Sequence, residues 1–366
     1  MQRVVFVCVL AAVLTSPAGA WAANVTLAAD HRVARYDDMV RFKGSVASAE
    51  PQQVSLLRDG VVVRTVVASG GRFVVDLRAR KPGTFVARSG LGDSPPVALR
   101  LQPRLRLRVV GQRRIGHRVF VVGRLLPARS GAVVLGRTRV RVAANGRFRL
   151  RVPTSRGLAF NRRLRVRPLA GYVPVARRLR VRLALPALQM GSHGPSVRAL
   201  KQRLRQLGYA LPNLDSGFGY RTYEAVLAFQ KVHRLDRTGR VDGRLWRLVS
   251  RSAVPQPRVR RGDYLEIDKS RQVLMEVRGG KVVRVIHVST GATGNTPVGT
   301  WRVYREVFGW DWILYHPMYF LRGFAIHGYP EVPTWPASHG CVRVPLWIAA
   351  SLRERWGLGS IVRVYP

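Results

Sequence analysis

Two residues near the C-terminus have types and spacing suited to acyl transfer. Cys341 follows His327 by 14 residues and lies in the segment Ser338-His339-Gly340-Cys341-Val342-Arg343. A thiol is a slow nucleophile at its unperturbed pKa of about 8.5, and a neighbouring imidazole that takes its proton makes it reactive. Gly340 lets backbone approach a substrate closely, and amide N–H groups there could receive an oxyanion. The pattern therefore indicates nucleophilic attack on a carbonyl.

The cysteine count makes Cys341 a candidate reactive group. The other cysteine, Cys8, lies in the apolar N-terminal segment, so an exported mature chain would carry one thiol and no internal disulfide. A lone cysteine is more often a small buried apolar residue than a catalyst, so the surrounding motif must decide.

Other chemistries use the same residue types. A zinc site could draw on His327, His339 and Cys341. A second cysteine is missing there and the nearest carboxylate is Glu331, so no metal and no cofactor is expected. A cysteine protease of another kind remains open, because Cys and His alone carry little specificity.

The longer pattern resembles a narrower family. His327-Gly328 followed by residues 338–343 is similar to the signature of the L,D-transpeptidase catalytic domain, the YkuD-type family. Residues 288–291 (VSTG) and 296–300 (TPVGT) resemble turns of that family. The resemblance implies that Cys341 is the acylated nucleophile and His327 its general base.

The resemblance also implies a supporting set of residues. The carbonyl of Gly328 would orient the imidazole, and Arg343 would hold the substrate or brace the loop. The full supporting set is Gly328, Ser338, His339, Gly340 and Arg343. His287 and His316 match no motif and are expected to be ordinary residues. Five aromatic residues flank the motif and belong either to a cleft or its lid or to the core: Trp310, Trp312, Tyr315, Tyr319 and Trp335.

The implied reaction is a two-step exchange on peptidoglycan stem peptides. Cys341 would attack the carbonyl of the third residue of a tetrapeptide stem and expel D-alanine, and an amine of a neighbouring stem would resolve the thioester. The alternatives are an L,D-carboxypeptidase, in which water replaces the amine, and a non-catalytic wall-binding protein.

The elements that must position this site belong to a predicted C-terminal domain, residues 262–366. Strands are predicted at 263–268, 272–277, 281–289, 299–307, 323–327 and 360–365, where apolar runs are separated by turn residues. A helix is predicted from Pro345 to Trp356, where Gly357 ends it. The expected fold is mainly β, with one or two helices.

A helical domain is predicted before it, at residues 188–250. Gly194-Pro195-Ser196 begins a helix that Gly208 ends, and further helices are predicted from Thr222 and Asp242. The segments GSHGPSVRALKQRLRQLGY (191–209) and AVLAFQKVHRLDRTGRVD (225–242) resemble the three-helix peptidoglycan-binding domain. That resemblance implies binding of glycan or stem peptide. Residues 252–261, with two prolines, predict an extended linker.

The N-terminal region predicts two tandem β-sandwich modules of immunoglobulin-like size, at 24–102 and 103–185. RFKGSV (41–46), GRFVVDLR (71–78) and PVALRL (96–101) each have a similar segment 75 to 80 residues later. In the second module arginine occupies every other position of several strands, which places it on one face. That face is either simply solvated or binds anionic wall polymers.

The net charge and the N-terminal segment indicate possible partners and the location of the protein. The formal net charge is +44, which attracts polyanions. Nucleic acid is not expected, because the basic runs lack interleaved aromatics and the chain is predicted to be exported. Residues 1–22 predict a signal peptide, with Arg3 before an 11-residue apolar run. The run is too short for a spanning helix, so cleavage is favoured over an anchor, and the expected location is the cell wall.

Overall fold

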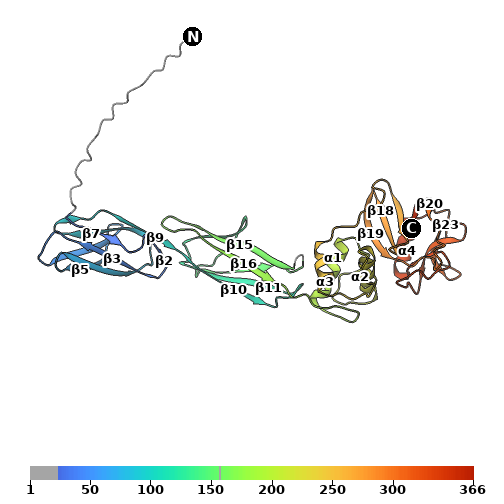
Figure 1. The fold of residues 1–366 in the computed structure, drawn as a ribbon, viewed down its shortest axis with the longest axis horizontal. Helices are drawn as coiled ribbons and strands as arrows, with labels where there is room; N and C mark the ends of the chain where they lie inside the picture. Colours follow the sequence, from blue (N-terminus) through green and yellow to red (C-terminus); the bar gives the residue numbers. More distant parts are fainter. Residues whose placement is uncertain (1–23, 156–157) are drawn as a thin grey trace, which may run out of the picture. The chain divides into compact units, whose positions relative to one another are not determined.

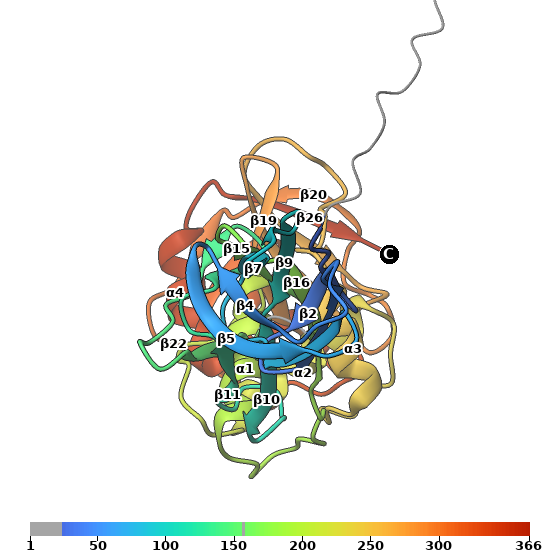
Figure 2. The ribbon, with the colours of Figure 1, turned by 90° about the vertical axis from the view of Figure 1, so that its left-hand side faces the viewer.

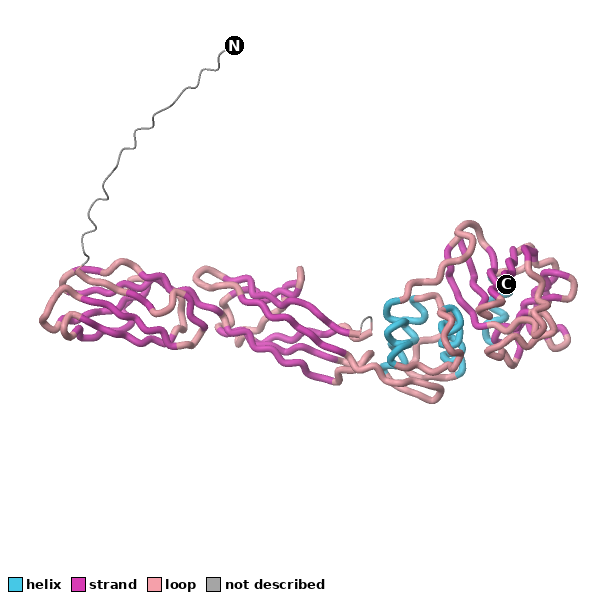
Figure 3. The backbone as a smooth tube through the Cα atoms, viewed as in Figure 1, coloured by secondary structure: helices cyan, strands magenta, loops and turns pink. Residues whose placement is uncertain are grey.

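The computed structural model describes residues 24–155 and 158–366. The predicted signal peptide lies outside the described residues. The chain forms two compact units, one of residues 24–107, 123–148 and 163–177, the other of residues 108–122, 149–162 and 178–366. Strands dominate the N-terminal and C-terminal parts of the chain (Figure 3), and three of the four helices among the described residues lie between these parts in the sequence. The predicted class, mainly β with a small helical domain, is confirmed.

The first β-rich stretch pairs its strands in two sheets. One sheet has the order β1-β3-β6 and the other β2-β9-β7-β4-β5, with β8 added to β7. Figure 2 shows β5 curving beside β4, its antiparallel partner. Val40, Phe42, Leu56 and Phe85 are among the buried residues of their common core. The strands are β1 (Ala28–Ala29), β2 (Val33–Arg35), β3 (Met39–Ser45), β4 (Gln52–Arg58), β5 (Val61–Ala68), β6 (Arg72–Arg78), β7 (Gly83–Ser89), β8 (Gly92–Asp93) and β9 (Val97–Gln102).

The second β-rich stretch also forms two sheets, of orders β10-β11-β14 and β13-β12-β15-β16. Along β14, Phe148 and Val152 are buried while Arg147, Arg149 and Arg151 are exposed. The predicted arginine face is therefore present. The strands are β10 (Arg104–Gly111), β11 (Val119–Leu126), β12 (Gly131–Leu135), β13 (Thr138–Arg139), β14 (Arg147–Val152), β15 (Ala159–Pro168) and β16 (Val175–Arg182).

The sequence repeat has a direct structural counterpart. In β3, a Cβ on Gly44 would lie 2.2 Å from the ring of Phe73, and in β11 a Cβ on Gly123 would lie 2.1 Å from the ring of Phe148. Glycine is required at both positions because the phenylalanine ring rests directly on its backbone. The same glycine and phenylalanine thus meet in both stretches.

The helical domain contains α1 (Pro195–Gln206), α2 (Tyr220–Val232) and α3 (Gly243–Arg251), shown together in Figure 1. The α1 and α3 starts match the prediction, and α2 begins two residues earlier than predicted. Asp242 caps α3, since its Oδ1 accepts a hydrogen bond from the Leu245 amide at 2.7 Å.

The C-terminal domain is built on two sheets and one helix. The first sheet has the order β19-β18-β17-β26-β20, and the second has the order β21-β23-β24-β25 with β22 added to β23. Its elements are β17 (Tyr264–Asp268), β18 (Val273–Arg278), β19 (Lys281–His287), β20 (Gly299–Arg302), β21 (Arg305–Glu306), β22 (Trp310–Asp311), β23 (Leu314–Leu321), β24 (Phe324–Tyr329), β25 (Val342–Pro345), α4 (Leu346–Arg355) and β26 (Ile361–Tyr365).

Both faces of the first sheet are buried. Leu265 and Ile267 of β17 point into a core shared with β24, β25 and α4. Tyr264 and Met275 point to the other face, where they share a core with Phe229 of α2. The C-terminal domain is therefore packed against the helical domain within one compact unit. Across the described ranges, no helix has the length and apolarity to cross a membrane.

Candidate active site

The candidate nucleophile and base come from neighbouring parallel strands. In the β24–β25 register, Ile326 pairs with Val342 and His327 with Arg343. Ile326 and Val342 belong to the core, and side chains alternate along a strand. His327 and Cys341, the residue directly before β25, therefore project from the opposite face of the sheet, two positions apart in the register.

His327 is held in a defined tautomer. Its Nδ1 lies 2.9 Å from the Gly328 carbonyl oxygen, so Nδ1 carries the proton and Nε2 keeps its lone pair. Only 2% of the residue is exposed. This burial lowers the pKa of His327 to about 4. The ring is therefore a neutral imidazole at neutral pH, with a basic nitrogen available.

The Cys341 thiol lies at the end of β24. The Ala325 amide donates to Sγ at 3.4 Å, and Sγ donates to the Gly323 carbonyl at 3.7 Å. Burial raises the pKa of the Cys341 thiol, while the amide and the Arg343 charge oppose that rise. The side chain is partly exposed. Both the thiol and the imidazole are thus neutral in the resting state, and the thiol has access to solvent.

The glycine and serine of the motif shape the turn before Cys341. Gly340 has φ of +135°, and a Cβ there would lie 2.4 Å from the Phe324 ring. Ser338 Oγ donates to the Cys341 carbonyl at 2.6 Å and accepts from the Gly340 amide at 3.0 Å. The Cys341 amide has no acceptor among the residues that the structure describes. Thr296 Oγ1 fixes the other side of the turn by donating to the Gly340 carbonyl at 2.7 Å.

The remaining motif residues differ in role. The Arg343 guanidinium lies 4.1 Å from the centre of the Tyr329 ring, on the sheet face that carries His327. This stacking braces Arg343. His339 is exposed, and its carbonyl accepts from the Asn295 side chain at 2.7 Å. Gly328 cannot carry a side chain freely, because a Cβ would lie 2.8 Å from the Ala349 Cβ.

The flanking aromatic residues divide between core and surface. Tyr319 is 8% exposed, lies opposite Ala325 and donates to Asp311 at 2.7 Å. Its place opposite Ala325 puts it on the same sheet face as Cys341. Three of the others are exposed, namely Trp310, Trp312 and Trp335. They are surface residues around the site.

Two basic residues of the helical domain contact this region, and no sequence motif predicts those contacts. Lys231 contacts His287, and Arg237 donates to the Thr334 carbonyl in the segment that leads to Cys341. His287 itself is 2% exposed. His316 is buried and accepts a hydrogen bond from the Gly309 amide. Within residues 24–155 and 158–366, no group of three or more His, Cys, Asp or Glu side chains could hold a metal ion.

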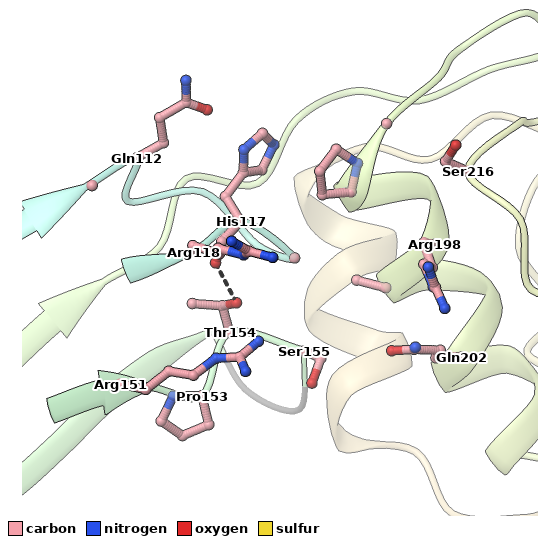
Figure 4. Close-up of a pocket in the computed structure, with 15 residues that line it drawn as sticks. Gln112, His117, Arg118, Arg151, Pro153, Thr154, Ser155, Arg198, Gln202 and Ser216 are labelled. Atoms are coloured by element: carbon pink, nitrogen blue, oxygen red, sulfur yellow. Dashed lines mark hydrogen bonds between the residues drawn. The ribbon is translucent and has the colours of Figure 1, made fainter. Parts of the chain in front are cut away.

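A separate groove of about 1190 Å³ lies between strand ends and the start of α1. Arg118, Thr154 and Arg151 come from the strand side, and Arg198 and Gln202 from the helix (Figure 4). Thr154 Oγ1 donates to the His117 carbonyl at 2.7 Å, which joins the two loops on the strand side. Besides three glycines, Pro153, Pro195 and Ala199, the residues that line this groove are polar or basic, and none is a carboxylate.

Comparison with known proteins matches two parts of the chain to known families. The family described as L,D-transpeptidase catalytic domain (YkuD) matches residues 262–364, and the one described as putative peptidoglycan binding domain matches residues 193–249. An L,D-transpeptidase structure from Xylanimonas cellulosilytica is 38% identical, over 98% of that chain and 50% of this one, with a TM-score of 0.47. The chain belongs to the L,D-transpeptidase family.

More distant members of the L,D-transpeptidase family are also similar. A structure from Stackebrandtia nassauensis is 22% identical, over 95% of that chain and 49% of this one, with a TM-score of 0.31. One from Mycobacterium tuberculosis is 17% identical, over 58% of that chain and 29% of this one, with a TM-score of 0.27. A search of curated proteins found no match. The two domains together associate this L,D-transpeptidase family member with the cell wall.

Proposed function

We propose that this protein is an exported enzyme that forms a thioester between Cys341 and a peptidoglycan tetrapeptide stem. It releases D-alanine and transfers the acyl group to an amine in the wall. The observation that carries the proposal is the placement of Cys341 and His327 on one face of adjacent strands, in a domain of the L,D-transpeptidase family.

In the first step, His327 Nε2 takes the thiol proton as Sγ attacks the carbonyl carbon of the third stem residue. The neutral state of both groups supports general-base catalysis over a preformed ion pair. The Cys341 amide is a candidate donor to the oxyanion, because the Gly340 amide is already bonded to Ser338. The C–N bond then breaks, and the imidazolium returns the proton to the leaving D-alanine amine.

In the second step, an acceptor amine attacks the thioester carbonyl. His327 takes the amine proton, the C–S bond breaks, and Cys341 returns to the thiol when the imidazolium gives up that proton. An L,D-carboxypeptidase would use the same two residues with water as the attacking group. A non-catalytic wall-binding protein would need neither.

One experiment separates these three functions. The mature protein is incubated with disaccharide tetrapeptide and followed by intact-mass spectrometry and product analysis. An acyl adduct followed by a cross-linked dimer is expected. Release of D-alanine without dimer would instead assign a carboxypeptidase. Absence of an adduct with the tetrapeptide and with a carbapenem would assign a non-catalytic protein, and Cys341→Ala provides the unlabelled control.

We further propose that the arginine-rich strands and the basic groove hold anionic wall polymers. The exposed arginines of β14 and the absence of carboxylates from the groove lining support this. Purified walls should sediment the protein at low salt and release it as salt rises. Replacing Arg118, Arg151 and Arg198 by glutamine should weaken sedimentation, and unchanged sedimentation would exclude the groove as the contact.

A further inference from the structure

The helical domain supplies one wall of the catalytic domain. Tyr264, Met275 and Val285, from three strands of the first sheet, share a core with Phe229 of α2 and Leu204 of α1. The Ala210 amide also donates to the Val285 carbonyl at 3.0 Å, which extends backbone hydrogen bonding across the boundary. The two domains are therefore one packed body at this boundary.

A lysine is buried at this boundary. Lys231 of α2 is 1% exposed, and its ammonium contacts three groups of the catalytic domain. Nζ lies 3.1 Å from the Gln272 carbonyl, 2.6 Å from His287 Nδ1 and 2.8 Å from the Val288 carbonyl. An ammonium has three N–H donors, so these three acceptors match it fully. Burial lowers the pKa of Lys231 well below its usual range, and the three acceptors oppose that effect because each of them takes one N–H of the ammonium.

The lysine fixes the state of His287. Burial lowers the pKa of His287 well below its usual range, and the Lys231 charge adds to that effect. The neutral ring accepts at Nδ1 from Lys231 and donates from Nε2 to the Val332 carbonyl at 2.7 Å. Each ring nitrogen therefore has a single partner, and the ring connects α2 to the segment that contains Val332.

That segment, residues 330–340, joins the two catalytic candidates. It begins directly after β24, which carries His327, and ends at Cys341. Ser289 Oγ donates to the Trp335 carbonyl at 2.7 Å, and the amides of Ala337 and Ser338 donate to the Thr290 carbonyl at 2.9 and 3.1 Å. Ser289 and Thr290 directly follow Val288, whose carbonyl Lys231 binds.

Lys231 also supports Thr290 by a second route. The side chain of Gln272 accepts from the Thr290 amide at 2.8 Å and donates to Thr290 Oγ1 at 2.6 Å. Lys231 binds the carbonyl of Gln272 as well as that of Val288. It therefore supports Thr290, which holds residues 330–340, both through the backbone that follows Val288 and through the side chain of Gln272. Arg237, also from the helical domain, donates to the Thr334 carbonyl of the segment itself.

We propose that Lys231 is a positioning residue for catalysis, which acts through His287 and residues 288–290 to set the distance between Cys341 and His327. The helical domain is accordingly a structural part of the active site as well as a wall-binding domain. This inference rests on the proposed function of Cys341 and His327.

The test uses the full chain and a matched pair of buried lysines. Lys201 in α1 is 3% exposed and also bonds three groups, namely Asn213, Asp215 and the Gly217 carbonyl, all within the helical domain. Lys231→Met and Lys201→Met therefore each remove three contacts of a buried lysine, one of them with a carboxylate in the case of Lys201, but only Lys231 reaches the catalytic segment. Each variant is assayed for thermal unfolding, for kcat and KM with the tetrapeptide donor, and for the rate of carbapenem acylation.

The expected result is a fall in kcat and acylation rate of about ten-fold or more in Lys231→Met, with a nearly unchanged donor KM. Lys201→Met should lower the melting temperature and leave kcat unchanged. Equal kinetic losses in both variants, or none in Lys231→Met, would overturn the proposal. Should Lys231→Met not fold, His287→Phe and Arg237→Gln decide in its place, and wild-type kcat in both would overturn it. A wild-type protein that is never acylated would refute the proposed function instead.

Discussion

The pH dependence of Cys341 acylation should reveal the environment of His327. With the pKa of His327 at about 4, about 90% of the imidazole is neutral at pH 5, whereas an unperturbed histidine of pKa about 6.5 would be about 3% neutral. The rate of acylation by a carbapenem at pH 5 should therefore remain within about 10% of its value at pH 7. An exposed histidine would give a decrease of about 25-fold over the same interval.

The measurement is the second-order acylation rate between pH 4 and pH 8, by stopped-flow fluorescence or quenched intact-mass spectrometry. Cys341→Ala supplies the blank, and carbapenem hydrolysis at each pH is subtracted. Circular dichroism must show a folded protein at every pH used. A decrease in the acylation rate at low pH with a midpoint near pH 6.5, in a folded protein, would refute the inference that burial keeps His327 neutral.

The same pKa has a consequence for stability. Because His327 binds a proton less readily in the folded state than in the unfolded state, stability is lost as pH falls from about 6.5 towards about 4. The difference in pKa corresponds to about 3 kcal/mol for this mostly buried group. Acid unfolding and the acylation profile should thus both respond to the pKa of His327.

Three substitutions test other parts of the site and its scaffold. Gly340→Ala should destabilise the fold by about 1–3 kcal/mol and reduce the acylation rate, because φ is +135° and the new Cβ would meet the Phe324 ring. Thermal unfolding and acylation rates measure both effects. Arg343→Gln should raise the pKa of both His327 and Cys341 by removing a nearby positive charge, which would shift the acid limb of acylation and the pH dependence of thiol alkylation upward. Glu276→Ala should cost about 3–5 kcal/mol in urea unfolding, because this fully buried carboxylate holds the side chains of Arg284, Arg355 and Trp356; a loss below 1 kcal/mol would contradict that role.

The sequence predicted most elements because their local signals agree with their environment. The α1 and α3 starts carry proline and aspartate signals, and six predicted strands of the C-terminal domain overlap observed ones. The strand β23 was not predicted. Its sequence, LYHPMYFL, contains Pro317, which argues against a strand. Apolar and polar residues do not alternate in it, because five consecutive residues are buried. Period-two patterns appear only where one face of a sheet is solvated.

The site was predictable only as far as its motif extends. His327 and the segment around Cys341 are close in sequence, so their resemblance to a family was visible without a fold. Lys231 carries no such signal, since it is one basic residue among 63 in the chain. Its three partners lie 41 to 57 residues away, and tertiary packing alone brings them together.

The two-sided burial of the sheet that contains β17 and β18 restricts how this protein can be cut or recombined. A shortened chain beginning at Gly262 would leave Tyr264, Met275 and Val285 facing water, which favours aggregation over catalysis. Gene fusions that contain the C-terminal domain without α2 would expose the same apolar residues. Shuffling of this family member should therefore preserve residues 188–366 as one inherited block.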